Sequence, residues 1–221
     1  MKTIVCIATG PSLTLQQIDT ARDKGFTLFA CNNAIFQAPD ADLLYGCNHE
    51  WWAYYWDDVK NLPCEKWTTS TIAATTHGIN WIAERHAPGL STDPKVIHHG
   101  HGSGYSLVSM AFRAGADRIV LLGYDLKYAP DYDPANRDPG SSHRHFFGEY
   151  PESMRHWPSV KVEKGVHVEL RDLYGEIKSQ NLVEVVNCTP GSAMDCFPNL
   201  DIADLDNERP ESPDKKPIHM V

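Results

Sequence analysis

Apolar residues gather in seven short runs, each of strand length, and stretches with helical periodicity separate several of them. The runs cover residues 3–8, 27–31, 42–47, 66–69, 95–98, 118–122 and 183–187. After Arg118 the sixth run is apolar throughout, which is typical of a central strand covered on both faces. This alternation predicts a mostly parallel sheet with helices on both sides.

Helical periodicity marks residues 14–24, 103–114 and 166–177. In the first of these segments Leu15, Ile18 and Ala21 lie near one face, and Thr14 with Gln17 can form a capping box. We therefore expect the α/β class, with one Rossmann-like, doubly wound domain over residues 1–200.

Two segments break this rhythm. Residues 127–158 are rich in Pro, Asp, His and aromatic residues and lack periodicity, which predicts a lid-like or binding loop. Residues 201–221 form an acidic, proline-containing tail that we expect to be extended, packing at most through Ile202 and Leu205.

The composition narrows the class of protein. The chain has 221 residues, 42% of them hydrophobic, and a net charge of −9, which disfavours a broad nucleic-acid surface. It shows neither a signal peptide nor a membrane span, and its six cysteines include no C-x-x-C pair. We expect a cytoplasmic protein with reduced cysteines, most of them in the core.

The turn after the first apolar run is the leading candidate for a ligand site. Gly10 permits close approach of a ligand, Pro11 stiffens the turn, and Ser12 follows just before the predicted helix. The turn contains neither a dinucleotide fingerprint nor a Walker loop. We expect Thr9, Gly10, Pro11 and Ser12 to bind a nucleotide; the alternative is an ordinary strand-to-helix turn.

Polar residues also follow the other predicted strands. Asn32 and Asn33 follow the second, Ser103 and Gly104 begin a helix after the fifth, and Asp125 follows the sixth. Since ligands bind beyond the carboxyl ends of strands in open α/β sheets, we expect these residues to converge on a nucleotide. For each, the alternative is a helix cap or a turn.

The long loop carries the candidate catalytic groups. His143 or His145 could act as a general base near neutral pH, and Arg144 could pair with a phosphate. Phe146 and Phe147 could close over a base or a sugar, or anchor the loop to the core.

We expect no metal site from these residues. His98, His99 and His101 lack a second ligand pair at a recognised spacing, so they indicate capping or solvated histidines. The Asp131–Asp133 pair resembles a D-x-D motif, but it lies between prolines with no preceding strand.

Aromatic residues cluster directly after Glu50: Trp51, Trp52, Tyr54, Tyr55 and Trp56. Such a cluster could line an acceptor pocket or form a homo-oligomer interface. A helix packed against the sheet is the equal alternative.

Six segments occur in an order that resembles a known family. They are GPSL, CNNAIF, GSGYS, LLGYDL, SHRHFFGEYP and VVNCTPGSAMDCF, and they span the chain to about Phe197. This order resembles the bacterial sialyltransferases of glycosyltransferase family forty-two. It also resembles their relatives, often phage-encoded, that share a domain with MptE-like 6-hydroxymethyl-dihydropterin diphosphokinases.

The resemblance implies a metal-independent site for a nucleotide sugar in one Rossmann-like domain. Gly10, Pro11 and Ser12 would approach the phosphate and ribose, and Asn32 or Asn33 the transferred group. Ser103 and Gly104 would contact the sugar carboxylate or the phosphate region, and Tyr124 and Asp125 would flank the nucleotide. Ser192 would lie near the base or close the site.

This chain departs from the family pattern in two places. The family's base histidine directly follows a glycine, but the residue after Gly148 is Glu149. Glu149, His143 or His145 would then supply the base. Thr9 also stands where the family has asparagine.

These observations favour a metal-independent transferase that uses a nucleotide-activated donor, with a nucleotide sugar as the leading donor. One alternative is a Mg²⁺-dependent diphosphokinase with Asp125, Asp131 and Asp133 as ligands. Another is a protein that binds or sequesters a nucleotide without chemistry.

Overall fold

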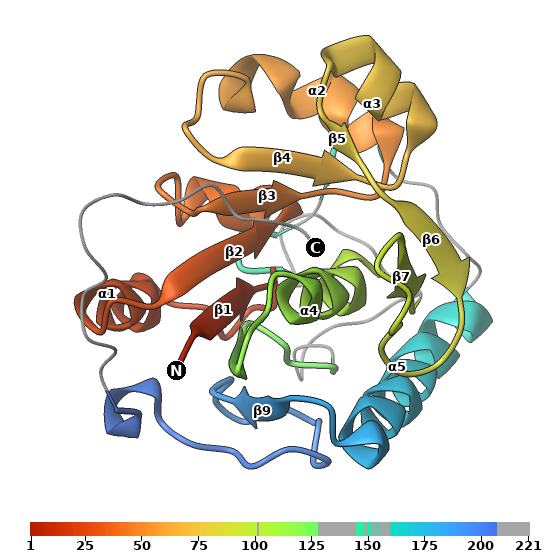
Figure 1. Ribbon diagram of the computed structural model, residues 1–221. Coiled ribbons are helices and arrows are strands. Elements are labelled where there is room, and N and C mark those ends of the chain that lie inside the picture. Colours follow the sequence, from red (N-terminus) through yellow and green to blue (C-terminus); the bar gives the residue numbers. More distant parts are fainter. Residues whose placement is uncertain (101, 128–144, 149, 152–153, 155–159, 207–221) are drawn as a thin grey trace.

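The computed structural model describes residues 1–100, 102–127, 145–148, 150–151, 154 and 160–206. A seven-stranded, all-parallel sheet has the order β5-β4-β3-β2-β1-β8-β9 (Figure 1). Its strands are β1 (Thr3–Ile7), β2 (Thr27–Cys31), β3 (Leu43–Tyr45), β4 (Glu65–Thr68), β5 (Asn80–Trp81), β8 (Arg118–Leu122) and β9 (Glu184–Asn187). The α/β fold predicted from the sequence is confirmed.

Helices cover both faces of the sheet, as expected for a doubly wound, Rossmann-like fold. They are α1 (Leu15–Asp23), α2 (His49–Val59), α3 (Thr71–His77), α4 (Ser103–Arg113) and α5 (Val160–Gln180), with short 3-10 helices η1 (Asn32–Phe36) and η3 (Ile202–Asp204). Within the described residues, no helix is both long enough and apolar enough to cross a membrane.

Alternation along the strands divides the core into two layers. Val5 and Ile7 pack with α1 and α2 on one face of the sheet, whereas Ile4 and Cys6 pack with α4 and α5 on the other. All four of these side chains are fully buried. Successive residues of β1 therefore serve opposite cores, which explains why the run is apolar throughout.

A second, two-stranded sheet pairs β6 (Ala83–His86) with β7 (Val96–His99). The run predicted at residues 95–98 is therefore a strand, but it lies outside the main sheet and packs on α4. Sequence patterning did not predict β6, because its residues are largely exposed and two of them are charged at neutral pH.

The other predicted strands match closely, but β5 was not predicted, and the helix predicted at 166–177 is longer in the structure, running from Val160 to Gln180. β2 and β8 have the predicted bounds, and the remaining predicted strands differ by no more than two residues at either end. Thr14 caps α1 as expected: its Oγ1 accepts from the Gln17 N–H at 3.4 Å, and Gln17 Oε1 accepts from the Thr14 N–H at 3.0 Å. Gln17 also donates to the Cys188 carbonyl at 3.0 Å, which joins α1 to the end of β9.

The first part of the tail packs on the domain. Ile202 and Leu205, the two residues expected to pack, are buried, but Ile202–Asp204 form η3 rather than an extended segment. The Lys24 ammonium of α1's C-cap donates to the Leu205 carbonyl. Residues 207–221 lie outside the described part of the chain.

The first two residues of the aromatic cluster, Trp51 and Trp52, belong to the hydrophobic core. Trp51 and Trp52 are buried in an edge-to-face pair with ring centroids 5.0 Å apart. The Trp51 indole donates to Asn33 Oδ1 at 2.7 Å, and the Trp52 indole donates to the Gly46 carbonyl at 2.9 Å. These contacts show that α2 is a helix packed against the sheet, while Tyr54 is exposed.

We expect Thr14→Ala to lower the free energy of unfolding by about 1 kcal/mol, because the capping hydroxyl is lost. Urea denaturation monitored by circular dichroism measures the change. Thr20→Ala on the same helix is the matched control, since its hydroxyl bonds only back to the Gln16 carbonyl. Equal effects of the two substitutions would contradict the capping role.

Candidate functional site

The site lies where the chain order across the sheet reverses. β1 stands between β2 and β8, so the chain winds toward β5 on one side and toward β9 on the other. Ligands bind at such reversal points, beyond the carboxyl ends of the strands. Thr9–Ser12 follows β1 there, and Gly123–Asp125 follows β8.

Two glycines let these loops touch. The Gly10 N–H donates to the Gly123 carbonyl at 2.9 Å. A Cβ at Gly10 would lie 1.9 Å from Asp125 Oδ2 and 2.4 Å from that carbonyl oxygen. Gly123 has φ +73°, and a Cβ there would lie 2.7 Å from the Ala8 carbonyl oxygen. Neither position can therefore carry a side chain: at Gly10 it would clash with Asp125 and the Gly123 backbone, and at Gly123 both the Ala8 backbone and the left-handed φ exclude it.

Ser12 and Asp125 meet across this junction. The Ser12 hydroxyl donates to Asp125 Oδ2 at 2.9 Å, and Asp125 is only 5% exposed. Burial raises the pKa of Asp125, while the hydrogen bond from Ser12 and the charge of Lys127 act in the opposite direction. A buried carboxylate beside a turn can accept hydrogen bonds from ligand hydroxyls.

The loop after β9 supports the β8 end from the other side. The Tyr124 N–H donates to Thr189 Oγ1 at 2.9 Å, and the Ser192 hydroxyl donates to the Tyr124 carbonyl at 2.6 Å. The Tyr124 hydroxyl donates to the Gly104 carbonyl at 3.0 Å. Three predicted site residues (Tyr124, Ser192 and Gly104) therefore form one hydrogen-bonded group, in which Ser192 holds the backbone.

His145 comes to this edge from the long loop. Its Nδ1 lies 2.8 Å from Thr9 Oγ1, and the Phe146 N–H donates to the Thr9 carbonyl at 3.1 Å. An isolated antiparallel bridge joins His145 to Gly148, which has φ +88°. The ring of His145 stacks on Phe147, with centroids 4.9 Å apart and planes 5° apart. Backbone, hydroxyl and stacking contacts together orient this imidazole.

Tyr150 extends the same loop toward β2. Its ring packs edge-on against His145 at 5.2 Å. Burial raises the pKa of Tyr150 well above its ordinary value, the nearby Cys31 and Tyr55 raise it further, and the Asn32 side chain lowers it. Residues of this loop thus lie beside the carboxyl ends of both β1 and β2.

The two predicted asparagines have different surroundings. Asn33 is 5% exposed; its Oδ1 accepts from Trp51, and its Nδ2 donates to the Tyr55 hydroxyl at 3.1 Å. Both ends of its amide are thus engaged in the packing of α2. Asn32 begins η1 with φ +49° and lies beside Tyr150.

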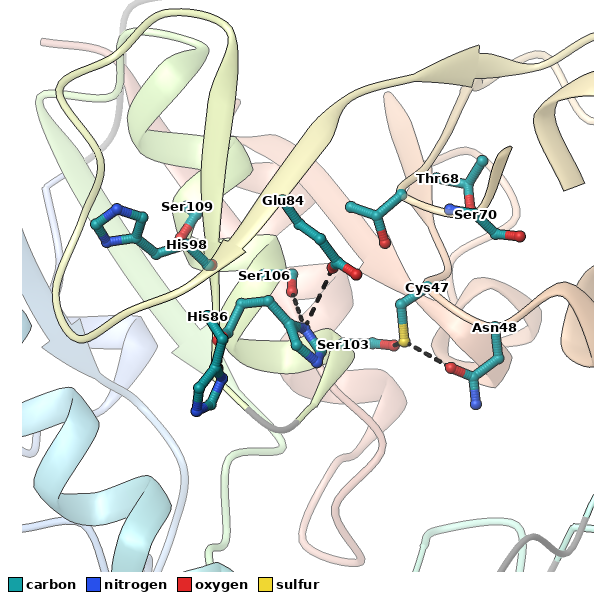
Figure 2. A network of polar contacts seen from close by, with 12 residues as sticks. Cys47, Asn48, Thr68, Ser70, Glu84, His86, His98, Ser103, Ser106 and Ser109 are labelled. Atoms are coloured by element: carbon teal, nitrogen blue, oxygen red, sulfur yellow. Dashed lines mark hydrogen bonds and ion pairs between the residues drawn. The ribbon is translucent and has the colours of Figure 1, made fainter. Parts of the chain in front are cut away.

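Ser103 lies against β3 rather than the β1–β8 junction. Its hydroxyl is 3.1 Å from the Cys47 thiol, which donates to Asn48 Oδ1 at 2.9 Å (Figure 2). The sequence interpretation placed Cys47 among the cysteines as a whole and gave it no site role. Its position at the end of the third apolar run, residues 42–47, was the available signal.

The two histidines that end β7 have protein partners. His98 Nδ1 lies 3.0 Å from the Pro88 carbonyl, and His99 Nδ1 lies 3.1 Å from Ser106 Oγ. The described residues include no group of three or more His, Cys, Asp or Glu side chains arranged to hold a metal ion. His101, Asp131 and Asp133 lie outside the described residues, as do the candidate bases His143 and Glu149.

No protein-family model, curated protein or solved structure matches this chain.

We expect Gly10→Ala to lower the free energy of unfolding by about 1–3 kcal/mol or more, because its methyl group would meet Asp125 and the Gly123 backbone. Urea denaturation measures this loss. Gly175→Ala in α5 is the control: among the described residues its Cβ has no neighbour within 4 Å, so helix propensity predicts a gain of up to about 1 kcal/mol. An unchanged stability for Gly10→Ala would contradict the described junction.

Proposed function

We propose that this chain is a transferase that uses a nucleotide-activated donor, with a nucleotide sugar as the leading donor and no required metal. The observation that carries this proposal is the contact of His145 with Thr9, 136 positions apart in the chain, at the reversal point of the sheet. A candidate base and a candidate nucleotide turn, chosen separately from the sequence, adjoin one another there.

The junction offers the groups that a nucleotide requires. The carboxylate of Asp125 can accept hydrogen bonds from ribose hydroxyls, and the Ser12 hydroxyl beside it can reorient toward a phosphate oxygen. Lys127 adds positive charge near Asp125, and this charge lowers the pKa of Asp125. The Lys127 ammonium lies close to Gly191, 3.6 Å from the position that a Cβ on this glycine would take. A phosphate here would meet a cation as well as neutral donors.

His145 would act as the general base. With Nδ1 oriented by Thr9, its Nε2 is the atom that would accept the proton from an acceptor hydroxyl as that oxygen attacks the donor carbon. The bond from donor carbon to phosphate oxygen breaks, and the nucleotide leaves with the electron pair. Hydrogen-bond donors and the Lys127 charge near the phosphate would stabilise the developing negative charge.

A thermal-shift panel tests the donor. It comprises CMP, CDP, UDP, GDP, ADP, ATP and their sugar conjugates, each with Mg²⁺ and with chelator. A ligand at about a hundred times its Kd should stabilise the fold by ~2.7 kcal/mol. We expect a shift with a sugar nucleotide that persists in chelator. A shift only with ATP and Mg²⁺ would favour the diphosphokinase with Asp125 as a ligand, and no shift with any compound would contradict the nucleotide site.

His145→Ala separates catalysis from binding. Loss of a general base should lower turnover of the donor identified in the panel by about 100-fold or more, while the nucleotide Kd changes by less than about threefold. The matched pair Thr9→Val and Thr9→Ser tests the orienting hydroxyl: only the valine variant should lose turnover. Equal losses of binding and turnover in His145→Ala would indicate a structural role, and tight binding without turnover in the wild type would favour a sequestering protein.

A further inference from the structure

A second polar network lies beside the first turn of α4 (Figure 2). His99, the last residue of β7, places Nδ1 3.1 Å from Ser106 Oγ and 3.7 Å from Glu84 Oε2. In a hydrolytic triad the serine and the acid take opposite ring nitrogens, whereas here both approach Nδ1. Ser106 is also fully buried, so this group is not a nucleophile with its base.

The network joins the small sheet to the main sheet. Ser106 hydrogen-bonds to the Tyr45 hydroxyl, which lies 3.4 Å from Thr69 Oγ1. Tyr45 belongs to β3, and Thr69 directly follows β4. A continuous polar path therefore runs from Glu84 on β6, through α4, to the carboxyl ends of β3 and β4. Buried hydroxyls in such a path are costly to leave without partners.

The same helical turn carries Ser103 and Gly104. Ser103 precedes Ser106 by three positions, so the two side chains lie on neighbouring parts of one face. Ser103 contacts the Cys47 thiol at 3.1 Å, and the Gly104 carbonyl accepts from Tyr124. A contact that fixes Ser106 therefore also fixes the first turn of α4. This turn contacts Cys47 after β3 through Ser103, and Tyr124 after β8 through Gly104.

The connection into this turn leaves little room for adjustment. A Cβ on Gly100 would lie 2.7 Å from the Tyr105 ring, and the His99 carbonyl lies 3.1 Å from His86 Nδ1. Both the backbone and the ring of His99 therefore have defined partners.

We propose that His99 is a positioning residue that fixes the first turn of α4, and with it the Ser103–Cys47 contact and Gly104 at the candidate site. Its effect on nucleotide affinity rests on the proposed function. Its effect on Cys47 does not, because that contact exists in the protein without ligand.

Alkylation of Cys47 by iodoacetamide measures how often the first turn of α4 moves away from Cys47. The rate is determined by peptide mass spectrometry on the full chain. His99→Ala should raise this rate by about fivefold or more, because the α4 turn opens more often without its anchor. His99→Asn should remain within about twofold of the wild type, because its amide can replace the Nδ1 contacts. His98→Ala is the matched control, since His98 bonds instead to the Pro88 and Gly89 carbonyls.

An unchanged rate in His99→Ala, or an equal increase in His98→Ala or His99→Asn, would overturn the positioning role. If His99→Ala does not fold, Glu84→Ala provides the test, because it removes the partly exposed partner of His99 and leaves Ser106 in place; it should raise the rate of Cys47 alkylation by about threefold. A rate within about twofold of the wild type in Glu84→Ala would then contradict the proposal.

Nucleotide affinity gives the second readout. The Kd for the nucleotide found in the panel should rise by about fivefold in His99→Ala and recover in His99→Asn. A wild type that binds no nucleotide would sink the proposed function, and the Cys47 rates would still decide the role of His99. An unchanged Kd with a raised alkylation rate would overturn the link between this turn and the ligand.

Discussion

The backbone contact between Gly10 and Gly123 is the constraint on which the rest of the site depends. It brings the ends of β1 and β8 so close that neither position can carry a side chain. Because the strand ends approach so closely, Asp125 accepts a hydrogen bond from the Ser12 hydroxyl, and Thr9 contacts His145 of the long loop. Any residue larger than glycine would separate the two strand ends, and the polar groups that converge there would move apart.

Hydrogen bonds from several neighbouring elements support the site around that contact. The loop after β9 supports the β8 end through Thr189 and Ser192, and Tyr124 carries the connection to α4. On the other side His99 anchors the same helix through Ser106. Groups that would touch a ligand are thus supported by buried hydrogen bonds from separate elements, which is how binding geometry is kept within narrow limits.

Apolar runs predicted six of the seven strands of the main sheet, because a buried strand leaves a continuous apolar signal. The helix cap at Thr14 and the packing of Ile202 were also predicted from local sequence. The exposed strands β5 and β6 left no such signal. Long-range pairing was also beyond local patterning: nothing near His145 in the sequence indicates that it meets Thr9, and the use of Asn33 by Trp51 appears only once α2 is packed.

Hydrogen exchange measured by mass spectrometry, with and without the nucleotide found in the panel, tests the central claim most directly. The claim is that a nucleotide binds at the junction of β1 and β8. Bound nucleotide should slow amide exchange in peptides covering residues 9–12, 123–127 and 145–148. Protection confined to the groove between α1 and the Asn199–Ala203 segment, or no protection anywhere, would contradict it.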